Sequence, residues 1–277
     1  MPSNLWIGPP GALYEIDQAA TSFDRSVELG VSEFKSLGGR ITVTRTPAPS
    51  RRMKLSWDRL PPVDARVLDG LARRVAGGPG PVLVIDPAAG NVLGAAQAAG
   101  RGDTGAAGLQ QWFKVSTTGT VAEVAAAPGT FTFTAADATS KVAWRSVPWG
   151  GNFPVAPGTR VSFRAPAAFA ALGTVGVNID FKKADGSYLS GPTAGGPYIA
   201  TTVPAGAVYA TPCATPGTAG TYSLAGACFA YDDGAAHTTP GDGLPPLAIT
   251  SYSDSPGRPL PYRSISVDLV EVSGAAG

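Results

Sequence analysis

The chain has 277 residues, enough for one large domain or two ordinary ones, and a hydrophobic content of 44% supports packed cores. Only 15% of the residues are charged, whereas 36 are glycine and 26 are proline, which favours many short strands joined by turns over long helices. The net charge of +1 gives no electrostatic argument for a nucleic-acid partner or an anionic membrane surface.

Residues 1–20 are expected to form an extended arm, because Trp6-Ile7 is separated from the next apolar run by Gly-Pro-Pro-Gly. Such an arm becomes ordered by lying on a larger body or on a neighbouring subunit. The start lacks the basic region and apolar run of a secretory signal, and no apolar stretch approaches the roughly 20 residues of a membrane span. We therefore expect synthesis in the cytoplasm and no membrane insertion.

Residues 23–30, 40–45 and 52–57 are strand candidates, and the latter two alternate between apolar and polar side chains. Alternation predicts that one face of these strands is buried. The residues expected to point inward are Ile41, Val43, Met53, Leu55 and Trp57.

Residues 60–74 form the one amphipathic helix that the sequence predicts. Its apolar stripe consists of Val67, Leu68, Leu71 and Val75. Two prolines stand in its first turn, where proline is tolerated, and a Gly/Pro-rich segment at 77–81 ends it. The apolar run at 81–87 then predicts a strand covered on both faces, so residues 1–89 read as a small antiparallel sheet carrying one helix.

From residue 90 the pattern changes to short strands at intervals of roughly 8–15 residues, separated by Pro/Gly turns, which is typical of a sandwich or jelly roll. The expected strands lie at 112–116, 130–134, 143–147, 160–165, 175–182, 199–203, 208–212, 222–230 and 264–272. The expected fold is therefore mainly β. A small split barrel or sandwich with one helix (α+β) occupies residues 1–89, and a β-sandwich jelly roll occupies residues 90–277.

Three segments of the first domain resemble the N-terminal module of tail proteins of long-tailed, siphovirus-type phages of actinobacteria, especially the distal tail and minor tail proteins. The segments are Phe-Lys-Ser-Leu-Gly-Gly at 34–39, Trp-Asp-Arg-Leu at 57–60 and the Gly-Pro-Gly-Pro strand at 78–87. The resemblance implies a ring of three or six copies at the tip of the tail tube. The implied partners are the tube and the tail-tip or baseplate proteins, and the implied location is the virion.

The later segments at 153–163, 177–189, 201–210 and 264–272, in that order, resemble the jelly-roll carbohydrate-binding module. Within a tail tip, this resemblance implies a module that contacts host cell-wall polysaccharide or packs against baseplate proteins. A stand-alone carbohydrate-binding protein, or an accessory module of a glycan-active system, is the alternative from a different class. A regulatory β protein without a sugar ligand is a third interpretation, which no pattern supports directly.

Carbohydrate sites combine flat aromatic faces with neighbouring polar groups. The candidate binding residues are Trp149, Asn152, Tyr188, Tyr198, Tyr231 and Tyr252. Trp149 is the best candidate, because the glycines that follow it would leave its indole uncovered, although core packing remains the alternative for each aromatic residue. The jelly-roll resemblance implies a structural calcium ion at Asp268 in the final strand. No cofactor besides this ion is expected.

No catalytic pattern is present, and we expect no enzyme activity. The sole histidine, His237, lies in a loop, and the adjacent Asp232 and Asp233 read as a solvated turn. The two cysteines, Cys213 and Cys228, lack the spacing of a zinc site. They could bridge a hairpin or remain two buried thiols, and the sequence leaves both open.

Overall fold

The computed structural model describes residues 4–45, 50–75, 80–86, 90–170, 175–236 and 240–272. The chain divides into two compact units. Unit 1 contains residues 1–15 and 83–244, and unit 2 contains residues 16–82 and 245–277. This division differs from the predicted boundary at 89/90, because the first residues of the chain belong to unit 1 and the last strands belong to unit 2.

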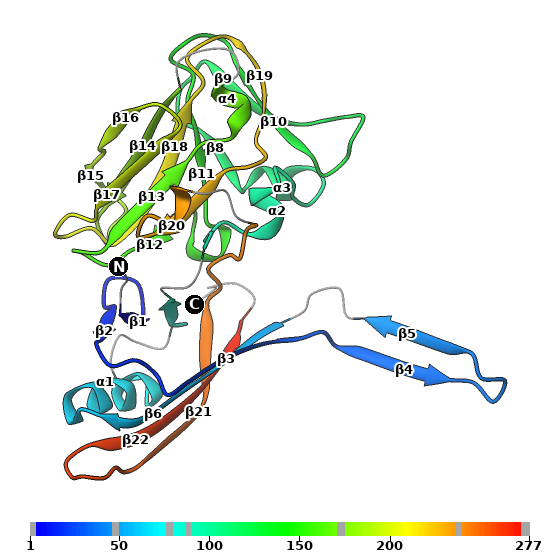
Figure 1. Cartoon of the computed structure of the whole chain (residues 1–277). Coiled ribbons are helices and arrows are strands. Elements are labelled where there is room, and N and C mark those ends of the chain that lie inside the picture. The colour runs from blue at the N-terminus through cyan, green and yellow to red at the C-terminus, as the bar shows by residue number, and fades with distance from the viewer. Residues whose placement is uncertain are drawn as a thin grey trace. The chain divides into compact units, whose positions relative to one another are not determined.

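Unit 2 is built on a four-stranded antiparallel sheet with strand order β21-β22-β6-β3 (Figure 1). The strands are β3 (Ser22–Glu28), β6 (Ser50–Leu60), β21 (Leu247–Pro256) and β22 (Arg263–Glu271). Leu55 and Trp57 of β6 are buried, as alternation predicts, and Val267 of β22 stands beside Leu55 in the register. The sequence predicts that the final strand closes the jelly roll. In the structure this strand, β22, instead lies in the sheet of unit 2, between β21 and β6, and its apolar face matches that of β6.

Helix α1 (Pro62–Ala72) packs against β21 and β22. Leu68 and Leu71 are buried in agreement with the predicted stripe, but Val75 is 79% exposed. The helix ends at Ala72, and Arg74 adopts a positive φ of 57°, so Val75 no longer follows the helical period. An ion pair between Asp69 and Arg73, 2.8 Å long and one turn apart, strengthens the last turn.

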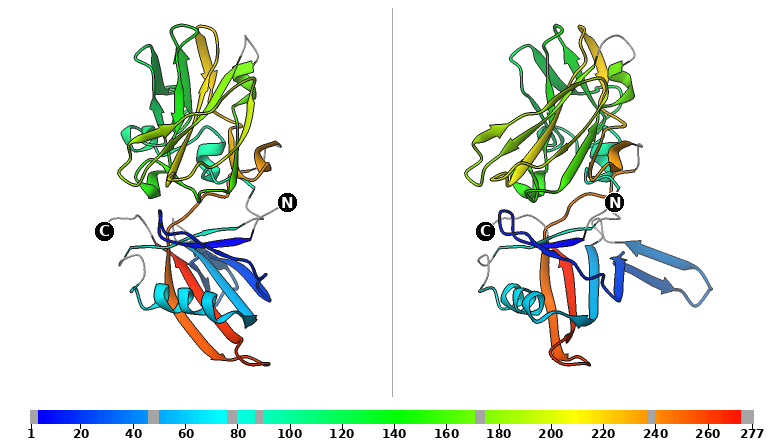
Figure 2. Two further views of the ribbon diagram at one scale, coloured as in Figure 1. Left: turned by 90° about the vertical axis from the view of Figure 1, so that its left-hand side faces the viewer. Right: turned by 60° about the vertical axis from the view of Figure 1, so that its left-hand side comes forward.

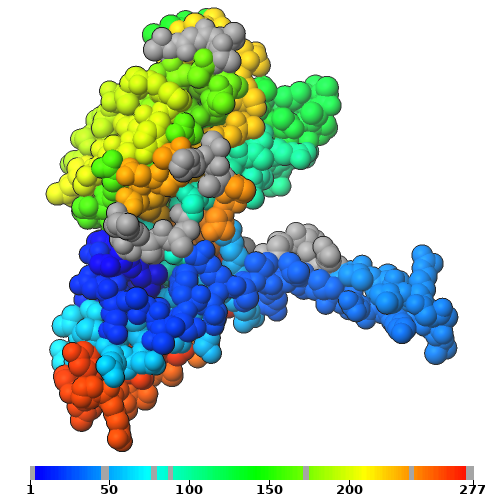
Figure 3. All heavy atoms as spheres, in the orientation of Figure 1, coloured from blue at the N-terminus to red at the C-terminus, as the bar shows by residue number. Residues whose placement is uncertain are grey.

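A two-stranded hairpin of β4 (Val31–Lys35) and β5 (Ile41–Arg45) projects from unit 2, and its strands pair only with each other among the described residues (Figure 1, Figure 3). Ser36 shapes the turn, since its carbonyl accepts from Gly39 and its hydroxyl accepts from the backbone N–H of Arg40. Both faces are open. The hairpin's exposed apolar residues are Val31 (42%), Phe34 (69%), Leu37 (111%), Ile41 (59%) and Val43 (47%). The prediction that Ile41 and Val43 point into a core is therefore wrong.

Unit 1 is a β-sandwich, which confirms the predicted fold class (Figure 2). One layer is a seven-stranded sheet with the path β15-β14-β18-β11-β8, to which β12 and β16 add. Its strands are β8 (Trp112–Lys114), β11 (Val142–Trp144), β12 (Phe153–Pro154), β14 (Gly176–Lys182), β15 (Tyr188–Ser190), β16 (Thr193–Gly195) and β18 (Tyr209–Thr215).

Two three-stranded sheets complete the sandwich, with orders β17-β13-β20 and β19-β10-β9. Their strands are β9 (Gly119–Glu123), β10 (Phe131–Ala135), β13 (Arg160–Arg164), β17 (Tyr198–Thr202), β19 (Gly220–Ser223) and β20 (Cys228–Tyr231). The N-terminal arm forms β1 (Leu5–Gly8) and β2 (Tyr14–Ile16), and β1 pairs with β7 (Leu83–Ile85). The arm is thus ordered by strand pairing, and β7 is buried throughout, as predicted.

Inward residues of the sandwich sheets share one aromatic core. The Trp144 ring lies 5.1 Å from that of Phe163 and 6.2 Å from that of Phe169. Between the strands the chain forms single helical turns, and one of them takes Val147, the last residue of the predicted strand 143–147. The turns are α2 (Ala95–Ala98), α3 (Ala106–Leu109), α4 (Ala167–Ala170), η1 (Val147–Trp149) and η2 (Gly234–Ala236). No helix among the described residues is both long and apolar enough to cross a membrane.

Asn91, fully buried, connects three segments of unit 1. Its Nδ2 donates to the Ala227 carbonyl, and its Oδ1 accepts from the backbone N–H groups of Leu93 and Phe229, each at 3.1 Å. Its carbonyl accepts from the N–H of Asp242 at 2.8 Å. Asn91 therefore anchors its own segment to two later segments of unit 1, around Ala227 and Asp242.

Cys213 and Cys228 are buried thiols, on β18 and β20, so the disulfide alternative is not formed. Burial raises the pKa of the Cys213 thiol, and the nearby Asp180 carboxylate raises it further. Both cysteines therefore act as small core side chains.

Candidate functional site

The outer face of the seven-stranded sheet combines exposed aromatic rings with polar groups. Strand register places Phe113 beside Ala143 on one edge of the sheet and Tyr188 beside Lys182 on the other. Phe113 is 54% exposed and Tyr188 is 63% exposed. At about 4.8 Å per strand, the four spacings from β8 to β15 span roughly 19 Å. The face is therefore wide enough to meet an extended ligand with an aromatic ring at each side.

A hollow of about 220 Å³ opens on this face. Its lining residues are Phe113, Ala143, Arg145, Gly151, Asn152, Lys182 and Thr211. Asn152 joins two of the other lining residues, because its Oδ1 accepts from Lys182 Nζ at 2.6 Å and from Thr211 Oγ1 at 2.9 Å. The hollow thus has an aromatic wall, a small apolar floor and a set of hydrogen-bonding groups.

The glycines before Asn152 have a different role from the predicted one. Gly150 and Gly151 adopt φ values of 66° and 97°, which side chains other than glycine rarely adopt. The Arg145 guanidinium also lies against Gly151, where a Cβ would collide with it. The glycines therefore shape the hollow and make room for Arg145, rather than uncovering the neighbouring indole.

Two of the predicted aromatic residues are buried in unit 1. Trp149 is 7% exposed, and its Nε1 donates to the Leu244 carbonyl at 2.8 Å. Tyr231 is also 7% exposed, its hydroxyl donates to the Pro154 carbonyl at 2.9 Å, and burial raises the pKa of its phenol. Each is anchored by a hydrogen bond in the core, so neither offers a face to a sugar, and the core alternative is correct for both.

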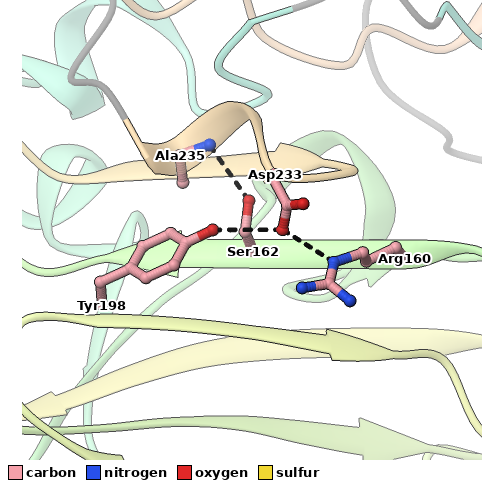
Figure 4. Close-up of polar contacts among 5 residues, drawn as sticks. All are labelled: Arg160, Ser162, Tyr198, Asp233 and Ala235. Atoms are coloured by element: carbon pink, nitrogen blue, oxygen red, sulfur yellow. Dashed lines mark hydrogen bonds and ion pairs between the residues drawn. The ribbon is translucent and has the colours of Figure 1, made fainter. Parts of the chain in front are cut away.

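Tyr198 lies on the other layer of the sandwich, in a polar cluster with Asp233 and Arg160 (Figure 4). The Asp233 carboxylate accepts from Arg160 Nε at 2.7 Å and from the Tyr198 hydroxyl at 3.3 Å. Ser162 nearby is fully buried and accepts from the backbone N–H of Ala235 at 3.0 Å. Burial and the Asp233 charge raise the pKa of Tyr198. Asp233 thus forms a surface ion pair with Arg160, which agrees with the prediction that Asp232 and Asp233 belong to a solvated turn rather than to a catalytic pair. His237 lies outside the described residues.

Tyr252 and Asp268 lie in unit 2, on β21 and β22. The register places Lys54 of β6 between Asp268 and Asp24 of the flanking strands. The premise of the calcium prediction, an aspartate in the closing strand of the jelly roll, is therefore wrong. Among the described residues, no three acidic, histidine or cysteine side chains gather in a way that could hold a metal ion.

Replacing Tyr252 by phenylalanine is expected to stabilise unit 2 by about 1 kcal/mol, because its buried hydroxyl has no hydrogen-bond partner among the described residues. Burial, followed by the charges of Asp254 and Asp69, raises the pKa of Tyr252 from 10 to about 12. The unfolded phenol ionises first, so the natural protein should lose stability as the pH rises from 10 to 12. Urea denaturation at pH 7, 9 and 11 tests this.

The matched control is Tyr262→Phe, at a tyrosine that is 38% exposed on the same unit. It should leave the urea midpoint unchanged at neutral pH. A Tyr252→Phe protein less stable than the natural one would show that the hydroxyl is satisfied in solution.

Of the predicted binding residues, the structure brings Asn152 and Tyr188 to one face and adds Phe113, Arg145, Lys182 and Thr211 to it. Alternation within 112–114 could have indicated Phe113, because an inward Trp112 forces the next side chain outward. Lys182 follows the inward Phe181 in the same way. Arg145 and Thr211 had no such local signal, because their place depends on which strands become neighbours.

No family model matches the chain, and no curated protein matches it. Among solved structures, an arabinose-bound α-L-arabinofuranosidase has 12% identity and a TM-score of 0.30, covering 51% of this chain and 26% of its own. The Clostridium thermocellum endo-1,4-β-D-xylanase 10B, with CBM22-1 and GH10 modules and xylohexaose, has 9% identity and a TM-score of 0.26, covering 63% and 28%.

A third structure, of carbohydrate-binding modules from the β-sandwich superfamily, has 14% identity and a TM-score of 0.25, covering 84% of this chain and 97% of its own. This chain thus spans about a quarter of the length of the first two proteins. All three similarities are too low to transfer a ligand or an activity. A function for this chain therefore has to be argued from its own residues.

Proposed function

We propose that unit 1 binds glycans through the outer face of its seven-stranded sheet, without catalysing a reaction. The observation that carries this proposal is the pair of exposed rings, Phe113 and Tyr188, on either side of a polar hollow. Aromatic faces offer apolar contact to the C–H side of a sugar ring, while Asn152 and Thr211 offer hydrogen bonds beside it. The same face could instead pack against another protein, because a fold does not by itself determine a function. A direct measurement of glycan binding is therefore the test.

Affinity electrophoresis of the full-length protein through gels containing host cell-wall polysaccharide tests this proposal. Phe113→Ala should lower the affinity at least fivefold, because the Phe113 ring is 54% exposed and is the aromatic side chain that lines the hollow. Tyr262→Ala, which removes an exposed ring from unit 2, is the control. A loss of binding with Tyr198→Ala but not with Phe113→Ala would move the site to the opposite layer.

We further propose that the protein assembles with copies of itself, as a distal or minor tail protein does on the tail tip of a long-tailed phage. The observation that favours this second function is the β4–β5 hairpin, with apolar side chains exposed on both of its faces. A free hairpin of two strands is marginally stable in water, so a second copy that covers it would stabilise it. The segment 34–39, part of the phage resemblance, forms its tip.

The two functions support each other, because a ring displays several copies of unit 1 on one surface. Weak contacts with a repetitive wall polysaccharide then gain strength from simultaneous engagement. A stand-alone carbohydrate-binding protein, the alternative from the sequence, would keep the first function and lack the second. The mass of the full-length protein in solution separates the two.

A further inference from the structure

We infer that the hollow beside Asn152 takes an anionic group, a carboxylate or a phosphate, carried by a glycan. This inference rests on the proposed glycan-binding function of unit 1 and names its class of ligand. The hollow's charged lining residues are Arg145 and Lys182, both cations. None of the ion pairs among the described residues involves either of them.

The hydrogen bonds of Asn152 identify which of its side-chain atoms is already engaged. A lysine ammonium can only donate, so the Asn152 atom 2.6 Å from Lys182 Nζ must be the carbonyl oxygen. The Asn152 amide N–H groups therefore point elsewhere, and no described residue accepts from them. Together with the remaining ammonium protons and the Arg145 guanidinium, these groups give the hollow several free donors.

A site lined with donors and positive charge selects anions, because charge-assisted hydrogen bonds to carboxylate or phosphate oxygens are stronger than neutral ones. Asp180 is the acidic residue beside the hollow on the same strand face as Lys182. Its oxygens are engaged by Asn178 Nδ2 at 2.6 Å and by the Cys213 thiol at 3.6 Å. These donors are neutral, so Asp180 keeps its formal charge of −1 beside the hollow, while Arg145 and Lys182 supply two positive charges in its lining. The balance of formal charge around the hollow is therefore still positive.

The volume of about 220 Å³ suits a single charged sugar unit rather than a whole polymer. Phe113 lines the hollow, and Tyr188 lies outside it, beside Lys182. Both rings would contact the neighbouring sugar units. The structure thus separates two roles on one face, with aromatic rings for the chain and cations for its acidic group.

Isothermal titration calorimetry of the full-length protein with oligogalacturonate, poly(glycerol phosphate) and neutral xylohexaose tests this inference. We expect one of the anionic ligands to bind at least tenfold more tightly than xylohexaose at 50 mM salt, with the preference weakening at 500 mM. Preference for oligogalacturonate identifies a carboxylate, and preference for poly(glycerol phosphate) identifies a phosphate.

The variant Lys182→Gln should lower the affinity for the preferred anion about tenfold, and Lys182→Arg should retain most of it. Lys183→Gln makes the same charge change at the exposed next residue and should have no effect. Equal binding of neutral and anionic ligands, or an unchanged affinity in Lys182→Gln, overturns the inference and leaves the glycan-binding function standing. Binding of none of the three ligands overturns the inference, and a failure to bind wall polysaccharide in affinity electrophoresis as well overturns the glycan-binding function.

Discussion

If copies of the chain assemble as proposed above, a full-length variant carrying Phe34→Ser, Leu37→Ser and Ile41→Thr is expected to be monomeric at concentrations at which the natural protein is a closed oligomer. The three side chains are 69%, 111% and 59% exposed. If each is buried against a second copy at about 1.5 kcal/mol, assembly loses about 4.5 kcal/mol, or roughly a thousandfold in affinity. Light scattering coupled to size-exclusion chromatography measures the change in mass.

A matched control replaces three exposed apolar residues of unit 1, with Leu109→Ser, Val115→Thr and Val147→Ser. These side chains are 37%, 42% and 46% exposed. The control should keep the mass of the natural protein. A natural protein that stays monomeric on its own and when mixed with isolated tail tubes would contradict the assembly proposal and favour the stand-alone alternative.

Replacing Asn91 by alanine is expected to destabilise unit 1 by about 4 kcal/mol. The substitution leaves two backbone N–H groups and one carbonyl buried without their partner, those of Leu93, Phe229 and Ala227. Each such group costs about 1–3 kcal/mol, and partial rearrangement keeps the sum below the maximum. Urea denaturation followed by the fluorescence of the tryptophans in unit 1 measures the loss.

Thr221→Ala is the control for Asn91→Ala, since it removes an exposed hydroxyl that pairs with Thr134 at 3.1 Å on the sandwich surface. It should change stability by less than about 0.5 kcal/mol. A cost below about 1 kcal/mol for Asn91→Ala would mean that water replaces the amide, and that the segments around it are less tightly joined than they are here.

The sequence was sufficient for elements whose burial repeats locally. The alternation in 52–57 predicted the buried Leu55 and Trp57, and the helical stripe predicted the buried Leu68 and Leu71. The same alternation was misleading at Ile41 and Val43, because a regular pattern says that one face is apolar and not what covers it. In this chain nothing in the described residues covers that face.

Pairings between distant strands were beyond local patterns. β22 has the alternation of a sandwich strand, and the sequence offered no reason to pair it with β6 rather than with its nearer neighbours. The prediction of the binding residues was correct for some and wrong for others, and distant parts of the chain decided which. Asn152 and Tyr188 lie on the outer face. Trp149 lies in the core, where the carbonyl of the distant Leu244 accepts its N–H. Site prediction from residue type therefore depended on a neighbourhood that only the fold provides.

The hydrogen bond between Ser56 and Ser266 joins residues 210 positions apart and reflects the pairing of β6 with β22. During synthesis β6 consequently leaves the ribosome long before its partner. At about 5–20 residues per second, its edge waits on the order of 10–40 seconds. Unit 1 ends at Leu244 and can complete its core within that interval, so the order of folding runs from the middle of the chain outward. A released chain truncated after residue 244 should hold a folded sandwich and an unfinished sheet whose exposed edge is open to wrong partners.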